Sequence, residues 1–440
     1  MNGAFFAGAA RRDITPPVGT ALCGYYPDFS STAVHDRLQV TALALRQNGT
    51  TVLLVNATLL SFQTALSNEI RRHVQRQCGV PYDHILLAAT HTHAAPNVLG
   101  IEGWGAIDRT YCDGILLPAV LDSCREALAQ LQPAEVALGE TSSAVGVNRR
   151  QRLPDGRVIL GQNPRGCYDP CMTVLSVRSE RGDGILNLLH YGCHGTAAGC
   201  TTEITRDWSG VAIDRLEEAT GVPTVFWNGA MGDVGPRLPD GRTAGDIRAM
   251  EALGEQAAAD ALAALGRLGG YRRPALAVGC GEVFLPYRPF PSLQEVQQRL
   301  HAIRHPEKLF NSRRLEYTYL HNLEMHLSGA AEKAPAGLAY RQTAVAVGDL
   351  VLVPFPFEVF SKISLQLRAH SPYPHTWLLS AVNGYYGYLP SQDQIDAGGY
   401  EIDVFLTANL YTLTDDTDQR IIRENLQIIR QLRETAGTDI

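Results

Sequence analysis

The chain has 440 residues, of which 45% are hydrophobic and 19% charged, and its formal net charge is −7. This composition is typical of a globular protein with ample material for a large core. The negative charge argues against binding to nucleic acid or to a membrane surface, which needs basic patches, and no apolar run reaches the roughly 18 residues of a membrane span.

The cysteines and the N-terminus bear on the cellular compartment. Nine cysteines at irregular spacing form no CxxC pair. The N-terminal stretch MNGAFFAGAARRDITPP has neither a basic segment nor a full apolar segment of the kind found in signal peptides. An odd number of thiols without a secretion signal predicts reduced cysteines in a cytoplasmic protein.

The first half of the chain alternates predicted strands and helices. The run TTVLLVNA at 50–57 is largely apolar, as in a strand that is buried on both faces. Leu66, Ile70 and Val74 recur at intervals of four, which is typical of the core-facing stripe of a helix. HILLAAT at 84–90 follows as the next buried strand. This order predicts a βαβ unit with parallel strands.

The rest of the chain continues in the same manner. Further strands are expected at GILNLLHY, at TVFWN, near 274–286, at TAVAVGDLVLVPF and at HTWLLSAVN, and amphipathic helices around 210–220, 246–266, 292–304, 313–327 and 359–369. We therefore predict an α/β fold with mixed β-sheets covered by helices, in a single domain over 1–440. The irregular segments 97–112 and 305–340 are either lids over a site or plain surface excursions.

Polar, glycine-rich segments follow directly on five of the predicted strands. They read HTHAAPN, GCHGTAAG, NGAMGDVGP, PFPFEVF and NGYYGYLP. In open α/β sheets, ligands bind in the crevice at the carboxyl ends of the strands. We therefore expect these five segments to converge on one site.

These segments contain candidate metal ligands. His91 and His93 lie in an extended segment, so both point to the same side and one metal can be reached by both or by one alone. His194 stands among small residues, and Glu358 ends an otherwise apolar strand, where a buried carboxylate without a cation would be costly. The alternatives are incidental loop histidines and a carboxylate near the start of helix 359–369.

A set of two histidines and a glutamate with an open position is typical of catalytic zinc. Such a site lowers the pKa of bound water to about 7 and polarises a carbonyl group. This chemistry favours hydrolysis of an amide or ester over a redox reaction. The sequence has no GxGxxG after its first strand, and the glycine-rich run 228–235 lacks the lysine of a P-loop.

An ordered series of motifs carries a resemblance to a known family. The motifs are RRDITPP at 11–17, VHDRLQVTALAL at 34–45, ATHTHAAP at 89–96, VNRR at 147–150, YGCHGT at 191–196, RDWSG at 206–210, NGAMGDVGP at 228–236, PFEVF at 356–360, NGYYGYLP at 383–390 and GGYE at 398–401. The series covers most of the chain. It resembles the catalytic, N-terminal domain of the neutral/alkaline non-lysosomal ceramidases, which are zinc-dependent amidases that hydrolyse N-acyl sphingosines.

The resemblance implies roles for individual residues. It implies one zinc ion per chain, held by His91, His194, Glu358 and Tyr388. Tyr388 is assigned by the resemblance alone, because YYGY by itself is typical of turn packing. His93 then lies beside the metal or faces substrate. Arg149 matches an arginine that orients substrate, and Tyr400 matches a tyrosine that stabilises the oxyanion.

Two departures from the family bear on the substrate. The ceramidases carry a catalytic serine where this chain has Gly235, so the reaction here would proceed by direct attack of metal-activated water, with Asp207 or His93 managing the proton. The chain also ends soon after GGYE, which leaves no room for the C-terminal immunoglobulin-like domain of the family. We therefore expect a small soluble substrate rather than a lipid.

Three of the candidate residues have structural alternatives. Asp207 is either catalytic or a charge at the start of helix 210–220. Asn228 either binds substrate or stabilises a tight turn. Trp104 either forms a wall of the substrate pocket or packs in the core.

The sequence thus predicts a zinc-dependent amidohydrolase that cleaves an N-acyl bond of a small molecule. A zinc-dependent esterase or lactonase is the alternative of the same class. A non-catalytic metal-binding relative, which retains the fold without the serine, is the alternative of another class. None of these predictions involves nucleic acid or membrane insertion.

Overall fold

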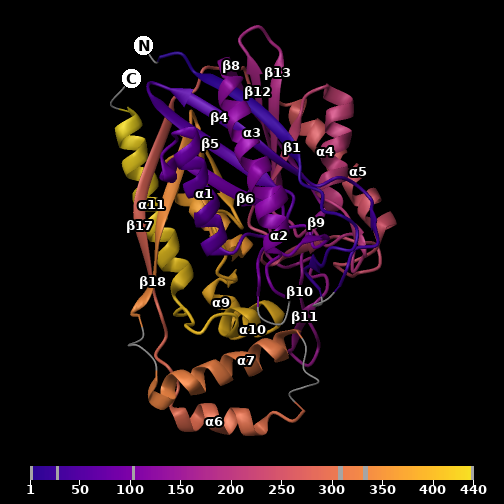
Figure 1. Cartoon of the computed structure of the whole chain (residues 1–440), viewed down its shortest axis with the longest axis vertical. Helices are drawn as coiled ribbons and strands as arrows, with labels where there is room; N and C mark the ends of the chain where they lie inside the picture. The colour runs from indigo at the N-terminus through magenta and orange to yellow at the C-terminus, as the bar shows by residue number, and fades with distance from the viewer. Residues whose placement is uncertain (1–2, 26–28, 102–104, 306–310, 331–334, 438–440) are drawn as a thin grey trace.

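The protein is a four-layer α/β/β/α sandwich, in which two β-sheets pack face to face between outer layers of helices (Figure 1). The computed structural model describes residues 3–25, 29–101, 105–305, 311–330 and 335–437. The predicted α/β class, with mixed sheets covered by helices, is confirmed.

The larger sheet has eight strands in the order β15-β13-β12-β8-β1-β4-β5-β6. Their bounds are β1 Phe6–Asp13, β4 Gln39–Gln47, β5 Thr50–Ala57, β6 Ile85–Ala89, β8 Gln132–Ser142, β12 Cys171–Ser179, β13 Gly184–Tyr191 and β15 Thr224–Asn228. Neighbouring strands are antiparallel except for the pairs β5–β6 and β13–β15. The predicted βαβ unit is therefore confirmed: β5 and β6 are parallel and are joined through α1 (Thr64–Cys78).

The smaller sheet has four strands in the order β17-β18-β19-β21. Their bounds are β17 Leu276–Pro286, β18 Gly337–Val347, β19 Leu350–Pro354 and β21 His375–Leu379. The run TAVAVGDLVLVPF, predicted as one strand, forms two, because the positive φ of 62° at Gly348 reverses the chain between β18 and β19.

The alternation of side chains explains why the strands read as continuously apolar. In β5, Val52 and Leu54 face the smaller sheet and belong to the core between the two sheets, together with Val345 and Leu352. Leu53 and Val55 of the same strand face the helices on the other side. Each strand of this kind is therefore buried on both faces.

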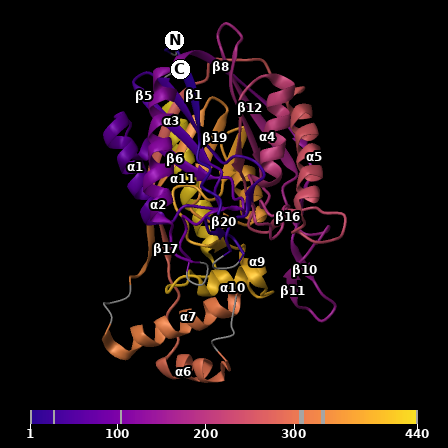
Figure 2. The same cartoon turned by 45° about the vertical axis from the view of Figure 1, so that its right-hand side comes forward.

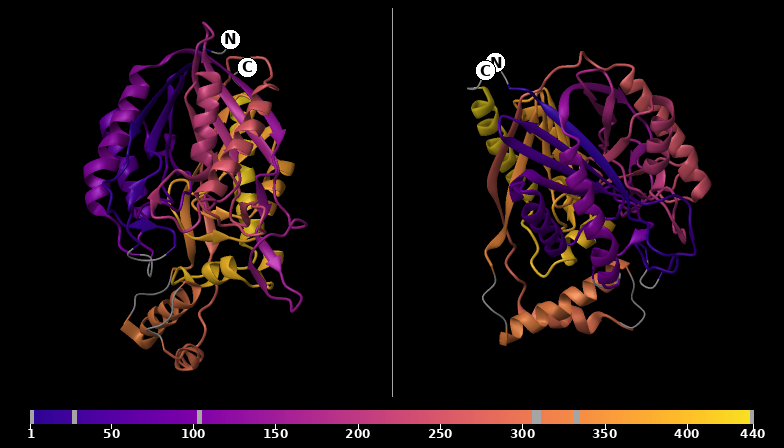
Figure 3. Two further views of the ribbon diagram at one scale, coloured as in Figure 1. Left: turned by 90° about the vertical axis from the view of Figure 1, so that its right-hand side faces the viewer. Right: turned by 45° about the horizontal axis from the view of Figure 1, so that its top comes forward.

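Helices cover both outer faces of the sandwich (Figures 1–3). The larger sheet is covered by α1 and α3 (Leu117–Ala129) over one half, and by α4 (Asp207–Thr220) and α5 (Ile247–Leu265) over the other. The smaller sheet is covered by α8 (Ser361–His370) and α11 (Thr417–Gly437), and α10 (Tyr400–Thr407) lies at the end of the sandwich. No helix in the described ranges is long and apolar enough to cross a membrane.

Short strand pairs connect the loops at one end of the sheets. They are β2 (Leu22–Cys23) with β7 (Ala95–Pro96), β3 (Ala33–Val34) with β14 (Glu203–Ile204), β9 (Gly146–Asn148) with β16 (Val234–Pro236), β10 (Arg150–Arg152) with β11 (Val158–Leu160), and β20 (Glu358–Val359) with β22 (Tyr388–Leu389). Two short helices, α2 (Arg109–Tyr111) and α9 (Gln392–Ile395), lie in the same loops. These loops contain every motif that contributes a predicted metal ligand.

A helical pair, α6 (Leu293–Ala302) and α7 (Asn311–Met325), projects from the sandwich beyond α10 (Figures 1 and 2). The two helices share a small apolar cluster of their own, formed by Val296, Leu320 and Leu323. Leu315 of α7 instead packs into the core under the smaller sheet. The projecting pair is thus attached to the body next to the loops described above.

Candidate metal centre

Backbone geometry at the end of β6 directs His91 toward the loop after β13. His91 has a φ of 74°, in the left-handed region, and its N–H donates to the Leu59 carbonyl at 2.9 Å. An isolated parallel bridge joins Thr92 to Gly195, which places the HTH segment alongside the loop that carries His194. Two of the five polar segments are therefore in direct contact.

All three histidines of these loops are held by the same hydrogen-bond pattern. The Nδ1 atom of His91 lies 2.8 Å from the Leu60 carbonyl oxygen, and that of His194 lies 2.8 Å from the Met231 carbonyl oxygen. The Nδ1 atom of His93 lies 3.1 Å from the carbonyl oxygen of Gly24. A carbonyl oxygen only accepts, so each Nδ1 carries the proton and each Nε2 of the neutral ring keeps its lone pair.

The three Nε2 atoms and one carboxylate oxygen converge. Ligand atoms of His91, His93 and His194 all lie within 4.8 Å of one another. Glu358 Oε2 lies 3.0 Å from His194 Nε2 and 3.5 Å from His91 Nε2. None of these four atoms has a hydrogen-bond partner, although all are buried. Buried polar atoms without partners are costly, and a cation bound between them would satisfy all four.

The protonation states match those that a metal requires. Burial and the nearby Arg149 together lower the pKa of His194 to about 4, so the ring is neutral at pH 7. Burial raises the pKa of Glu358, but His91 and His194 outweigh it and hold that pKa well below its ordinary value. Metal ligands must be neutral imidazole or ionised carboxylate, and these groups already are.

Two groups are available for a fourth ligand position. The β20–β22 pair sets Tyr388 directly opposite Glu358, and the ring of Tyr388 stacks on that of His194 with centroids 6.5 Å apart. Tyr388 Oη accepts a hydrogen bond of 2.7 Å from Arg149. The alternative is His93, whose Nε2 has no partner.

A cavity of about 200 Å³ opens onto this cluster. His91, His93 and Glu358 line it, together with the predicted Arg149, Tyr388 and Tyr400. Its remaining walls are mainly apolar and come from several elements: Leu60, Leu99, Ile101, Leu160, Leu315, Val404 and Ala408. Leu99 and Ile101 belong to the irregular segment 97–112 and Leu315 of α7 to the segment 305–340, so both irregular segments contribute walls.

Comparison with known proteins agrees with this geometry. Residues 5–245, more than half of the chain, match the family model described as neutral/alkaline non-lysosomal ceramidase, N-terminal. The chain belongs to this family. No curated protein matches it.

Two solved structures of ceramidases show the same fold. The crystal structure of neutral ceramidase from Pseudomonas aeruginosa is 19% identical, with a TM-score of 0.73 over 99% of this chain and 75% of that one. A ceramidase complexed with C2 is 18% identical, with a TM-score of 0.74 over 98% of this chain and 76% of that one. The ceramidase family implies a hydrolase that acts on an amide bond.

The predicted catalytic residue Asp207 of this ceramidase-family chain lies behind the cavity rather than in it. The Asp207 carboxylate accepts hydrogen bonds from the N–H groups of Ala197, Ala198 and Trp208, and burial raises its pKa to about 6. Asp207 thus holds the loop after His194 in place. This positioning role does not support the prediction that Asp207 is catalytic. Trp104, predicted as a pocket wall, lies outside the described residues.

Asn228 connects the ends of two strands. Its side-chain nitrogen donates to the carbonyl groups of Thr90 and Cys193, and its side-chain oxygen accepts from the N–H of Cys193. These residues directly precede His91 and His194. The amide therefore positions the two histidine loops, and the prediction that it binds substrate is not supported, since Asn228 is not among the residues that line the cavity.

The structure adds residues that the sequence analysis did not assign to the site. Tyr385 donates from its hydroxyl to Glu358 Oε1 at 2.7 Å and so orients that carboxylate. Tyr25 lines the cavity 5.4 Å from the His93 ring, and its hydroxyl is buried without a partner. Tyr385 lies in NGYYGYLP, one of the five segments expected at the site, but its residue type did not mark it as part of a metal centre, and no motif marks Tyr25.

The region of Gly235 explains why this position holds no side chain. A Cβ atom there would lie 2.8 Å from Cβ and 2.9 Å from Cγ2 of Thr243. Thr243 itself lines the cavity. A serine at 235 would therefore require Thr243 to move.

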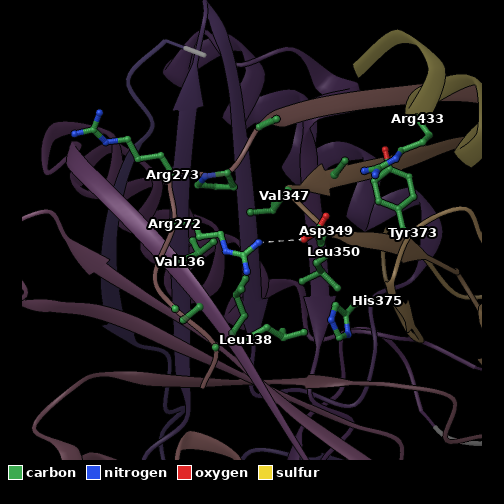
Figure 4. A pocket seen from close by; sticks show the side chains of 18 residues that line it. Val136, Leu138, Arg272, Arg273, Val347, Asp349, Leu350, Tyr373, His375 and Arg433 are labelled. Atoms are coloured by element: carbon green, nitrogen blue, oxygen red, sulfur yellow. Dashed lines mark ion pairs between the residues drawn. The ribbon is translucent and has the colours of Figure 1, made fainter. Parts of the chain in front are cut away.

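A cavity larger than the one at the histidine cluster is not the metal centre. A groove of about 430 Å³ lies between the two sheets at the turn that joins β18 and β19 (Figure 4). Arg272 and Asp349 face each other there at 3.8 Å. His375 is the one histidine among its lining residues. The chemistry of the ligand atoms, rather than the volume, therefore identifies the site.

Substitution of Gly195 by alanine should separate the two histidine loops. The new Cβ would lie 2.6 Å from the carbonyl oxygen of His91 and 3.0 Å from Thr92 Cα, and both are backbone atoms. We expect a loss of roughly 1–3 kcal/mol in unfolding free energy and reduced metal retention, measured by urea titration and metal analysis. Gly114→Ala, where a Cβ meets open space, is the control. Equal metal retention in both variants would contradict the proposed contact.

Compared with His194→Asn, the metal-free wild type should lose more stability as the pH falls from about 6.5 toward 4. Burial lowers the pKa values of His93 and His194, the latter to about 4, so the unfolded chain binds more protons than the folded one in this window. Unfolding free energy should therefore fall by roughly 1.4 kcal/mol per pH unit for each such histidine. Urea titrations at several pH values would measure the slope, and His194→Asn should lower it. An unchanged slope in that variant would contradict the assignment.

Proposed function

We propose that the protein is a zinc-dependent hydrolase that cleaves the amide bond of an N-acyl substrate. The observation that carries the proposal is the convergence of three unpartnered imidazole nitrogens and one unpartnered carboxylate oxygen beside a cavity. Membership of the ceramidase family supports hydrolysis of an amide.

Zinc suits the donor set best. His91, His194 and Glu358 supply the nitrogen and oxygen ligands typical of catalytic zinc, and we assign the fourth position to Tyr388. Among the residues that the structure describes there is a single such cluster, which supports one ion per chain. A zinc ion held there would polarise the scissile carbonyl and lower the pKa of an attacking water.

His93 is suited to manage the proton of that water. Its Nε2 has no partner and lies beside the ligand atoms of His91 and His194. Burial, together with the two neighbouring imidazoles, lowers the pKa of His93 well below its ordinary value, so the ring is neutral and can accept a proton. His93 then returns the proton to the leaving amine.

Tyr400 and Arg149 face the same cavity as hydrogen-bond donors. Burial raises the pKa of the Tyr400 hydroxyl above its ordinary value, so it stays protonated and can donate to the oxyanion that develops on the carbonyl. Arg149 also lines the cavity and can orient a substrate oxygen.

The cavity favours a compact, apolar acyl group. Its volume of about 200 Å³ lies below the roughly 300–1,000 Å³ of sites for drug-sized ligands. Its walls beyond the metal ligands are mainly aliphatic. We therefore propose a small N-acyl amide as the substrate, with the acyl chain against Leu60, Leu99 and Leu315.

Metal analysis and a substrate panel test the proposal together. Protein purified without added metal should contain about one zinc per chain, and His194→Ala and Glu358→Gln should lose it, because each removes a ligand. His370→Ala, an exposed histidine on α8, is the matched control and should keep the metal.

The panel consists of N-acyl amides of increasing chain length and the matching oxygen esters. We expect amide hydrolysis that disappears in the two ligand variants. Cleavage of esters alone would favour the esterase or lactonase alternative. A zinc-bound protein that hydrolyses nothing in the panel would favour the non-catalytic alternative.

Tyr400→Phe should separate catalysis from metal binding. Removal of one oxyanion donor typically lowers kcat by about 10²–10³. Zinc content should stay at the wild-type level, because Tyr400 is not among the proposed ligands. Steady-state kinetics with metal analysis on the same sample would check both, and loss of zinc from this variant would overturn the assigned role.

A further inference from the structure

The buried carboxylate of Glu401, in the GGYE motif, contacts both arginines of the VNRR motif, about 250 residues earlier in the sequence. Its Oε1 accepts from Arg149 Nε at 2.7 Å, and its Oε2 accepts from Arg150 Nη1 at 2.8 Å. The exposed fractions of Glu401, Arg149 and Arg150 are 1%, 5% and 3%. Charges buried this deeply are retained only with close partners, and this carboxylate has one arginine on each oxygen.

The two arginines differ in what else they contact. Arg150 does not line the metal cavity. It donates to the Gly398 carbonyl at 2.7 Å and to Gln394 Oε1 at 3.2 Å. Arg149 lines the metal cavity and donates from Nη2 to Tyr388 Oη at 2.7 Å. Arg150 therefore anchors the carboxylate, and Arg149 extends the contact into the site.

Because the guanidinium of Arg149 is planar, the position of Glu401 determines how that group is oriented. A guanidinium is a rigid fork, so an acceptor that fixes Nε also fixes the direction of Nη2. Glu401 thus determines where Arg149 meets the Tyr388 oxygen. It also directly follows Tyr400, the first residue of α10, whose ring lies 6.0 Å from that of Tyr388.

We propose that Glu401 is a positioning residue that aligns Tyr388 for the metal through Arg149 and sets Tyr400 at the rim of the same cavity. The inference rests on the proposed function, in that Tyr388 is taken as a zinc ligand. It assigns to Arg149 a second role beside substrate orientation: it directs the phenol oxygen toward the metal ligands.

Copper-loaded protein gives a spectroscopic readout of Tyr388 coordination that does not depend on enzymatic activity. A phenolate bound to Cu²⁺ has a visible charge-transfer band, so the wild type should show one and Tyr388→Phe should not. Glu401→Gln should weaken or shift this band. In competition with a chromogenic chelator, it should also bind zinc about 10–100-fold more weakly, as is typical when a residue that orients a metal ligand is replaced.

Arg150→Gln is the matched control, because it removes the other ion pair of the same carboxylate and leaves Arg149 and Tyr388 in place. Because the Arg149–Glu401 pair survives without this anchor, we expect Arg150→Gln to lower stability and to change the copper band and the zinc affinity less than Glu401→Gln does. Equal effects of Glu401→Gln and Arg150→Gln on the band would overturn the inference and reduce Glu401 to a structural role.

The remaining outcomes separate the inference from the proposed function. A wild-type protein without the band overturns Tyr388 as a ligand and the inference with it. A wild-type band that Glu401→Gln leaves unchanged overturns the inference alone. If Glu401→Gln does not fold, Glu401→Asp keeps the charge but withdraws the carboxylate, and an unshifted band in that variant would also overturn the inference.

Discussion

The metal centre depends on one repeated interaction, the hydrogen bond from a histidine Nδ1 to a backbone carbonyl. Leu60, Gly24 and Met231 supply these carbonyls to His91, His93 and His194. Each bond fixes a tautomer and a ring orientation together, so the three Nε2 lone pairs converge before any ion binds. Because the acceptors are backbone atoms of three separate loops, the two-sheet frame that holds those loops determines the geometry of the site.

This arrangement places several buried polar atoms without hydrogen-bond partners close together, which is energetically unfavourable. One oxygen of the ionised Glu358, Oε2, and the Nε2 atoms of three histidines are buried without hydrogen-bond partners. The surrounding core tolerates this, because Asn228 and Asp207 satisfy the backbone groups of the loops, and Tyr385 occupies the other oxygen of Glu358. The four atoms that a divalent cation would bind remain unsatisfied. The pattern therefore indicates a preorganised site, in which the ligand atoms carry local instability that a cation would relieve.

The sequence alone predicts those parts of the metal centre that depend on short, local sequence patterns. His91, His194 and Glu358 stand directly after buried strands, and the βαβ unit around 50–90 follows from hydrophobic periodicity. Strands β8 and β12 were not predicted, because their position in the sheet depends on pairing between segments far apart in sequence. Asn228 and Asp207 were assigned to chemistry because their residue types suit both roles, and only their hydrogen-bond partners distinguish positioning from catalysis. The contacts of Glu401 with Arg149 and Arg150 span 252 and 251 residues, so no spacing rule reveals them.

These long contacts show that the centre belongs to the whole sandwich. The family match ends at residue 245, yet Glu358, Tyr388, Tyr400 and Glu401 all lie beyond it. The first part of the chain supplies the histidines and Arg149 from loops at the edge of the larger sheet. The second part, folded around the smaller sheet, supplies the carboxylate and the phenols. Neither part alone would bring neutral imidazoles and an ionised carboxylate together, because the core between the two sheets sets the distance between them. Metal binding should accordingly stabilise the docking of one sheet on the other, and not merely the loops that contact the ion.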